Sequence, residues 1–168
     1  MRILIVDDTA TQLDLAKQLL KDHEITTASG WSAAKRLLTS GSRKYDNPNV
    51  FDVVLTDLMM PGEEEGLGKY DHVGKLVPYG FNVAMLALRC GVKKVALVSN
   101  GQGDDGNHHQ HPVLWACDDL NGFKFEGRLM FFTGYQCPHM DEDREEVKGI
   151  DSPYHLKDWG KVLADLTA

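Results

Sequence analysis

Short apolar runs alternate along this chain with segments in which apolar residues recur every three or four positions. The runs predict five strands, at about residues 2–6, 24–28, 53–56, 94–99 and 128–133. The third run is continuous and rich in β-branched residues, which is typical of a central parallel strand buried on both faces. The repeated order of strand and then helix predicts a doubly wound α/β sheet with right-handed crossovers.

The helical periods between these runs predict four helices. The first carries Leu13, Ala16, Leu19 and Leu20 on one face; the others are expected at about residues 32–38, 82–90 and 156–166. Thr9 or Thr11 is the candidate N-cap of the first helix and Ser32 that of the second. Gly91 is expected to end the third helix, because glycine tolerates the left-handed backbone of a helix C-terminus.

Carboxylates follow two of the predicted strands. Asp7 and Asp8 end the first apolar run, and Asp57 follows the third. Because parallel strands end at one edge of a sheet, we expect these acids to lie close together. Unpaired, they would repel one another, so a divalent cation or perturbed pKa values should accompany them. The alternative role of Asp7 and Asp8 is to cap the N-terminus of the following helix. The presence of Asp57 at the same edge of the sheet makes this role less favoured than a shared cation site.

Composition narrows the class of protein. The 168 residues are 42% hydrophobic and 26% charged, as expected for one globular domain spanning 1–168. The net charge of −7 disfavours a nucleic-acid surface. Three irregularly spaced cysteines, Cys90, Cys117 and Cys137, favour free thiols in a reducing compartment. No signal-peptide or membrane-spanning pattern is present, so we expect a cytoplasmic protein that does not enter a membrane.

Three motifs within the first hundred residues carry a family resemblance. They are ILIVDD at the start, LTDLMMPG at the third strand and GVKKVALVSN at the fourth, in that order. With them the chain resembles the receiver domains of response regulators, the phospho-acceptor half of two-component signalling. The resemblance implies a flavodoxin-like, five-stranded parallel sheet of order 2-1-3-4-5, with helices on both faces.

The resemblance also implies roles for individual residues. Asp57 would accept a phosphoryl group from a sensor histidine kinase or a phosphotransfer protein, and Ser99 would hydrogen-bond the phosphorylated aspartate. Asp7, Asp8, Asp57 and the backbone carbonyl of Met59 would hold Mg²⁺. The chemistry needs such an ion, because a carboxylate attacks a charged phosphoryl group poorly unless the phosphoryl oxygens are neutralised. Any catalysis would be limited to self-phosphorylation and self-dephosphorylation.

The chain also departs from the family pattern. Extra residues are expected at about 63–81, beside the phosphorylation site, and at about 101–112, after Ser99. Their Gly and Pro content predicts loops, and the acids at residues 63–65 are expected to be solvated or to cap a short helix. The second segment contains GQGDDG, whose sequence context disfavours a dinucleotide site. It also contains His108, His109 and His111. These could bind a soft or borderline cation with Cys117, Cys137 or His139, although no zinc-site spacing supports that role and solvent exposure is the alternative.

The lysine that receivers carry after the fifth strand has no clear counterpart in the sequence. The best alignment places Cys137 and Pro138 where a Lys-Pro pair is expected, and Cys cannot form that salt bridge. Lys124 and Lys148 are alternative sources of a cation. Tyr135 is the candidate aromatic switch residue, with packing against the sheet edge as its alternative role.

Several functions remain open at this stage. The leading hypothesis is a stand-alone receiver, phosphorylated on Asp57, that signals through a downstream protein. A divergent pseudo-receiver that binds proteins without phosphotransfer is the main alternative. A haloacid-dehalogenase-type phosphohydrolase is disfavoured because its second acid should stand two residues after the nucleophile, whereas Asp7 is followed by Asp8 and Thr9. A flavodoxin-like nucleotide binder is disfavoured by the missing phosphate loop.

Overall fold

The computed structural model describes residues 1–40, 51–63, 73–99, 124–125, 128–133 and 156–168. Several predicted features lie outside these ranges. They are residues 64–72 of the first extra segment, the second extra segment at 101–112 with its histidines, the switch candidate, the cysteine aligned with the family lysine, and one alternative lysine: His108, His109, His111, Tyr135, Cys137 and Lys148. Among the described residues, no helix combines the length and the apolar character that crossing a bilayer requires.

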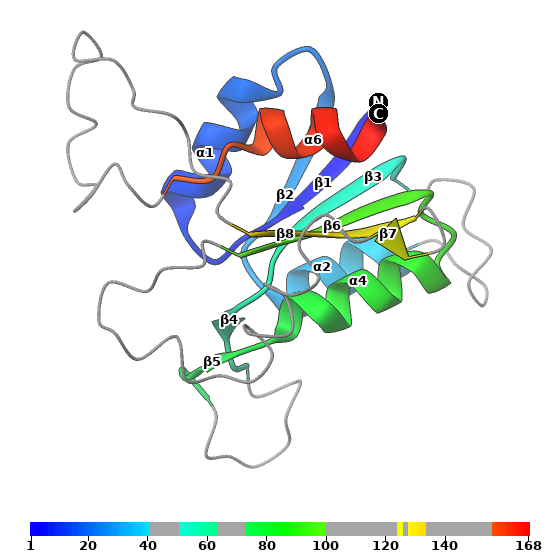
Figure 1. Cartoon of the computed structure of the whole chain (residues 1–168). Helices are drawn as coiled ribbons and strands as arrows, with labels where there is room; N and C mark the ends of the chain where they lie inside the picture. The colour runs from blue at the N-terminus through cyan, green and yellow to red at the C-terminus, as the bar shows by residue number, and fades with distance from the viewer. Residues whose placement is uncertain (41–50, 64–72, 100–123, 126–127, 134–155) are drawn as a thin grey trace, which may run out of the picture.

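A twisted parallel sheet forms the centre of the molecule (Figure 1). Its strands are β1 (Arg2–Val6), β2 (Glu24–Ala28), β3 (Val53–Asp57), β6 (Lys94–Ser99) and β8 (Leu129–Thr133), in the spatial order β2-β1-β3-β6-β8. All four pairings between these strands are parallel. The predicted order 2-1-3-4-5 is therefore confirmed. A two-residue strand, β7 (Lys124–Phe125), adds an antiparallel edge to β8.

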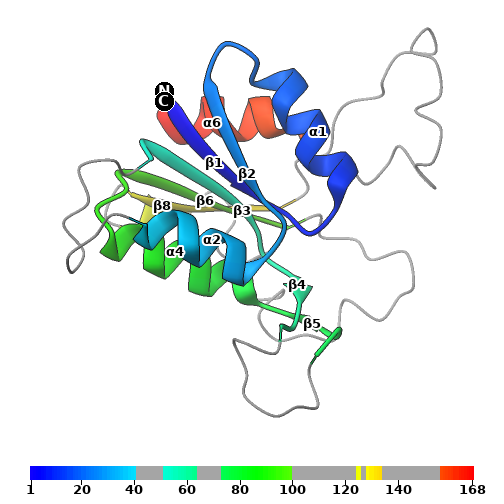
Figure 2. The same ribbon diagram turned by 180° about the vertical axis from the view of Figure 1, so that it is seen from behind.

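Helices cover both faces of the sheet, as Figures 1 and 2 show from opposite sides. α1 (Ala10–Leu19) and α6 (Trp159–Thr167) lie on one face, whereas α2 (Trp31–Thr39) and α4 (Tyr79–Arg89) lie on the other. α6 begins three residues later than the predicted 156, because Asp158 caps it by accepting a hydrogen bond from the Lys161 backbone N–H at 2.9 Å. This places Leu156 and Lys157 before the helix.

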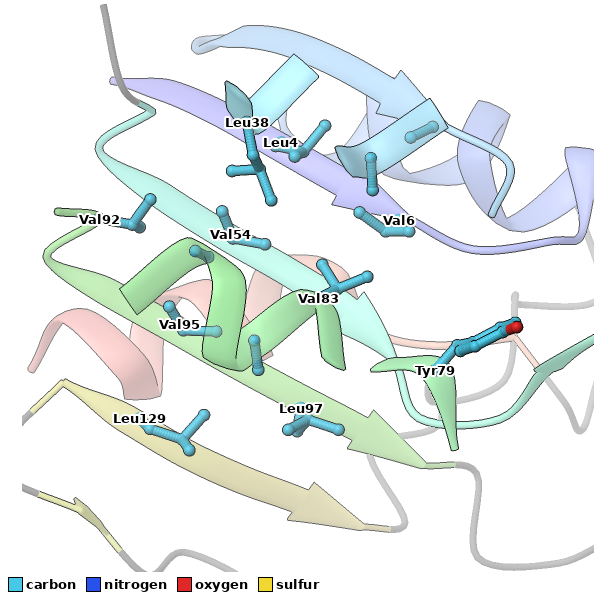
Figure 3. Packing of buried hydrophobic residues seen from close by; sticks show 14 of the residues in the cluster. Leu4, Val6, Leu38, Val54, Tyr79, Val83, Val92, Val95, Leu97 and Leu129 are labelled. Carbon is cyan, nitrogen blue, oxygen red and sulfur yellow. The ribbon is translucent and has the colours of Figure 1, made fainter. Parts of the chain in front are cut away.

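Each face of the sheet has its own hydrophobic core. Alternate residues of β1 and β3 point to opposite sides, so that Leu4 and Val54 pack under α2 and α4, and Ile3 and Leu55 pack under α1 and α6. Figure 3 shows the first of these cores. Trp159 is fully buried in the second core. Packing in these two cores fixes the position of the segment before α6 relative to the sheet.

The connection after β3 differs from the loop predicted at 63–81. Short strands β4 (Met60–Pro61) and β5 (Leu76–Val77) pair antiparallel, and α4 begins at Tyr79 rather than at residue 82. Gly91 ends α4 with a φ of 89°, as its sequence position predicted. The described ends of the predicted extra segment are thus paired before α4 begins, at β4–β5 and at the bridge between Gly62 and Val73.

The helix N-termini show one correction to the sequence prediction. Thr9 stands at the N-cap of α1, but its side chain makes no capping hydrogen bond. At α2 the N-cap is Gly30, and Ser32 contributes only its backbone N–H, which donates to Glu63 Oε2 at 2.9 Å. The acid that caps α2 therefore comes from the segment after β4, 31 positions away. This contact ties the loop after β3 to a neighbouring helix.

Candidate functional site

The carboxyl ends of three neighbouring strands bring the predicted site residues together. Asp57 is the last residue of β3, Asp7 follows β1 directly, and Ser99 is the last residue of β6. In the β3–β6 register Asp57 is opposite Val98, so Ser99 lies one position further along the same edge. Asp7 is fully buried and Asp57 is 9% exposed. Buried acids of this kind need compensating partners.

Lys157 is the partner of both acids. Its Nζ atom lies 2.5 Å from Asp7 Oδ2 and 2.8 Å from Asp57 Oδ1. The lysine is 4% exposed, and its ammonium lies 5.4 Å from the centre of the Trp159 ring. Removing water from such a pair makes each interaction stronger and the loss of either partner more costly. The site is therefore a buried cluster of two carboxylates that share one ammonium.

The charges of this cluster are not balanced. Burial raises the pKa of Asp57 to about 7; Lys157 opposes this shift, and the negative charges of Asp7 and Asp8 add to it. Burial, followed by the charge of Asp7, also raises the pKa of Asp8. Burial would lower the pKa of Lys157, but Asp57 and Asp7 outweigh it and raise that pKa above its usual range. One ammonium thus faces an excess of carboxylate charge, which favours binding of a proton or a further cation.

The backbone after Asp57 is fixed from two sides. The Leu58 N–H donates to the Val98 carbonyl at 2.9 Å, and the Gly80 N–H donates to the Leu58 carbonyl at 3.0 Å. A Cβ atom on Gly80 would lie 1.8 Å from the Asp57 carbonyl oxygen, so only glycine fits there. The N-terminus of α4 therefore packs directly on the peptide that follows the candidate phospho-acceptor.

The predicted Mg²⁺ ligands are only partly assembled. Asp8 lies exposed at the rim, Met59 is half-buried in the loop after β3, and the nearest oxygens of Asp7 and Asp57 face Lys157. Within the described ranges, no group of three His, Cys, Asp or Glu side chains is arranged to hold a metal ion. The donors nevertheless suit Mg²⁺, which takes few carboxylates and completes its shell with water. Their excess negative charge also suits a hard cation.

Lys157 is the functional residue that the sequence analysis missed. Residues 134–156 separate it from β8, and Asp158 rather than proline follows it. The alternative Lys124 belongs to β7, and β6 and β8 lie between this strand and β3, which carries Asp57. Lys157 fell inside the predicted helix 156–166. An Asp directly before Trp159 was the available sign that the helix begins later.

Comparisons with known proteins were made for the whole chain. No protein-family model matches it. Among solved structures, it is similar to a response regulator receiver domain protein from Clostridium thermocellum, with 28% identity over 63% of this chain and 69% of that chain and a TM-score of 0.42. It is also similar to the non-phosphorylated HemR receiver domain from Leptospira biflexa, with 21% identity over 64% and 71% of the two chains and a TM-score of 0.41.

A third similar structure is a CheY-like response regulator receiver domain protein from Methanospirillum hungatei, with 22% identity over 64% of this chain and 70% of that chain and a TM-score of 0.38. All three are receiver domains, the family that the sequence resembles. The strand order and the helices on both faces define the fold of this chain as a doubly wound, flavodoxin-like α/β sheet.

Proposed function

We propose that this chain is a receiver domain that is phosphorylated on Asp57 and signals through a protein partner. The observation that carries the proposal is the buried contact of Asp57 with Lys157 at the carboxyl edge of the central strand. Ligand sites in open α/β sheets lie at this edge. An acid and a lysine held there, with a second acid on the neighbouring strand, suit the binding and transfer of a phosphoryl group.

In the proposed reaction a carboxylate oxygen of Asp57 attacks the phosphorus of a phosphohistidine or of a small acyl phosphate. A new O–P bond forms while the P–N or P–O bond of the donor breaks, and the leaving group keeps the electron pair. The imidazole then takes a proton from solvent, whereas a carboxylate leaving group needs none. The reaction requires Asp57 as the carboxylate.

Asp7, Asp8, Asp57 and the Met59 carbonyl are the residues that would hold Mg²⁺. The ion would supply charge neutralisation on the phosphoryl oxygens. Lys157 would donate to a phosphoryl oxygen of the modified Asp57, and Ser99 would donate its hydroxyl to another. The phosphoryl group would then compete with Asp7 for the ammonium of Lys157. The unphosphorylated and phosphorylated forms would therefore differ in the contacts of this lysine.

The partners follow from the proposed role. A sensor histidine kinase or phosphotransfer protein would supply the phosphoryl group, and a downstream protein would bind the modified form. The net charge of −7 supports a protein rather than a nucleic acid as the target. We place the protein in the cytoplasm, where such kinases present their phosphohistidine.

The test is intact-mass analysis after incubation with a small acyl phosphate, with Mg²⁺ or with a chelator. The proposal expects an adduct of roughly 80 Da, the mass of one phosphoryl group, that requires Mg²⁺ and is absent from Asp57→Asn. Asp52→Asn is the matched control, because Asp52 lies just before the same strand and binds Arg2 at the opposite end of the sheet. An adduct that persists in Asp57→Asn contradicts the proposal.

A pseudo-receiver is the second candidate, and one observation favours it. Lys157 already pairs with both buried acids, so each of them has a positively charged partner that is neither a metal nor bound to a phosphoryl group. Such a protein would bind a partner through its surface without phosphotransfer. The same mass experiment separates the two functions: the pseudo-receiver gives no adduct in the wild type under any Mg²⁺ concentration.

A further inference from the structure

Gln12 makes a buried contact with the lysine of the site. Its Oε1 atom accepts a hydrogen bond from the Lys157 backbone N–H at 3.0 Å, across 145 positions of sequence. Gln12 is 5% exposed, on the third residue of α1. A buried side-chain amide is costly unless its polar atoms are bonded, and a buried backbone N–H equally needs an acceptor. The two groups therefore satisfy each other.

The same strand–helix unit thus holds both ends of Lys157. Asp7, at the end of β1, binds the ammonium, and Gln12, on the helix that follows, binds the backbone. A lysine side chain is long and flexible, so the position of its backbone decides where the ammonium can reach. With the backbone fixed by Gln12, Nζ reaches Asp7 and Asp57 together.

Lys157 stands between two regular elements of the chain. The described strand β8 ends at Thr133, and α6 begins only at Trp159, so the lysine stands outside both elements. On its C-terminal side, the Lys157 carbonyl accepts from the Trp159 N–H at 3.0 Å and Trp159 is anchored in the core. On its N-terminal side, Gln12 supplies the described attachment of the backbone N–H.

We propose that Gln12 is a positioning residue, which holds the Lys157 backbone where the ammonium can serve Asp57. Its effect on phosphotransfer rests on the proposed function above, whereas its effect on Lys157 does not. The competing explanation is that Gln12 only fills space between α1 and α6. If Gln12 is a positioning residue, its loss lowers the phosphotransfer rate by displacing Lys157. If Gln12 only fills space, the effect of its loss does not depend on Lys157.

The first measurement is amide exchange at Lys157. Gln12→Met keeps the length of the side chain but removes the acceptor, so exchange of the Lys157 amide should become at least roughly ten-fold faster. Gln12→Glu keeps an acceptor oxygen and should restore protection. Leu13→Val is the matched control, since Leu13 is the next residue of α1, packs in the same core as Trp159, and has an apolar side chain that cannot accept a hydrogen bond.

The second measurement is the rate of adduct formation with a small acyl phosphate at saturating Mg²⁺. Gln12→Met should lower this rate roughly ten-fold, because a small displacement of a participating group is enough for a loss of that size. Leu13→Val should lower it less than two-fold. In a Lys157→Ala background, adding Gln12→Met should change the rate less than two-fold, because Gln12 would act through the residue already removed.

Each outcome decides between the explanations. An equal loss of rate from Gln12→Met with and without Lys157, or unchanged Lys157 exchange in Gln12→Met, overturns the positioning role. If the wild type forms no adduct but Lys157 exchange responds to Gln12→Met and recovers in Gln12→Glu, the proposed function fails and the positioning contact stands. If the adduct forms normally in Gln12→Met, the proposed function stands and the positioning role fails.

Discussion

Lys157 and Asp57 form a buried ion pair, with 2.8 Å between Nζ and Oδ1, although 100 positions of sequence separate them. Asp7, which directly follows β1, binds the same ammonium. The three residues come from the first strand, the central strand and the segment before the last helix. The site therefore forms only when β1, β3 and the segment before α6 are packed together.

The shared ammonium predicts competition between Lys157 and Mg²⁺. Lys157→Ala removes a positive charge that faces the proposed metal ligands, so Mg²⁺ should bind roughly ten-fold more tightly at pH 8. Isothermal titration of the unphosphorylated protein measures this affinity. Lys161→Ala is the control, because Lys161 lies in α6 and pairs with Asp165 on the exposed face of that helix. Weaker Mg²⁺ binding in Lys157→Ala would exclude competition.

The raised pKa of Asp57 predicts how stability depends on pH. Between about pH 4 and pH 7 the folded protein retains a proton on Asp57 that the unfolded chain has lost. The folded state then binds more protons, so the free energy of unfolding should fall as pH rises through this window, by at most about 1.4 kcal/mol per pH unit from this group. Above about pH 7 this contribution stops changing.

Urea unfolding in Mg²⁺-free buffer at pH 5, 6, 7 and 8 measures that dependence. Asp57→Asn cannot ionise and should show a flatter profile than the wild type, whereas Asp52→Asn should keep the wild-type slope. Equal slopes in the wild type and in Asp57→Asn would show that Asp57 has an ordinary pKa in the folded protein.

The close approach of α4 to Asp57 predicts a strongly destabilising substitution. In Gly80→Ala the new methyl group would overlap the Asp57 carbonyl oxygen, and we expect a loss on the order of 3 kcal/mol in unfolding free energy together with slower phosphorylation. Gly160→Ala is the matched control: Gly160 is also the second residue of a helix, and its Cβ would lie 3.4 Å from the nearest atom, Asp158 Oδ1.

Gly160→Ala should be neutral or stabilise the protein by up to about 1 kcal/mol, since alanine favours the helix. Thermal and urea unfolding of both variants give the comparison. If Gly80→Ala were as well tolerated as Gly160→Ala, the packing of α4 on the Asp57 peptide would be looser than the structure shows.

The contact between Glu63 and α2 predicts a cap supplied from outside the helix. Glu63→Ala removes the acceptor of the Ser32 N–H and should cost about 1 kcal/mol in unfolding free energy. Ser32→Ala should change stability by less than about 0.5 kcal/mol, because the contact uses the Ser32 backbone and not its hydroxyl. Urea unfolding of the two variants measures both changes in stability. A larger loss in Ser32→Ala than in Glu63→Ala would show that the Ser32 side chain, and not Glu63, caps the helix.

The sequence predicted the local elements of the sheet well because their apolar runs are continuous. β1, β2 and β6 have the bounds that the pattern predicts, and the acids that follow β1 and β3 meet at one edge as strand direction requires. These features depend on residues close together in sequence. They could therefore be predicted without knowing how distant segments of the chain pack together.

The partners of the acids were not predictable from the same information. Lys157 reaches the site because Trp159 packs in the core and Gln12 binds its backbone, and both are contacts between distant segments. The family spacing pointed instead to Cys137, which lies outside the described residues. Glu63 likewise caps a helix that precedes it by 31 positions. Contacts of this kind leave no periodic pattern in the chain.

Because Gln12 of α1 and the docked start of α6 set the position of Lys157, that position follows from packing and not from the sequence distance between β8 and α6. The lysine is held beside a docked helix, so a change that loosens α6 from its core would withdraw the ammonium from both acids at once.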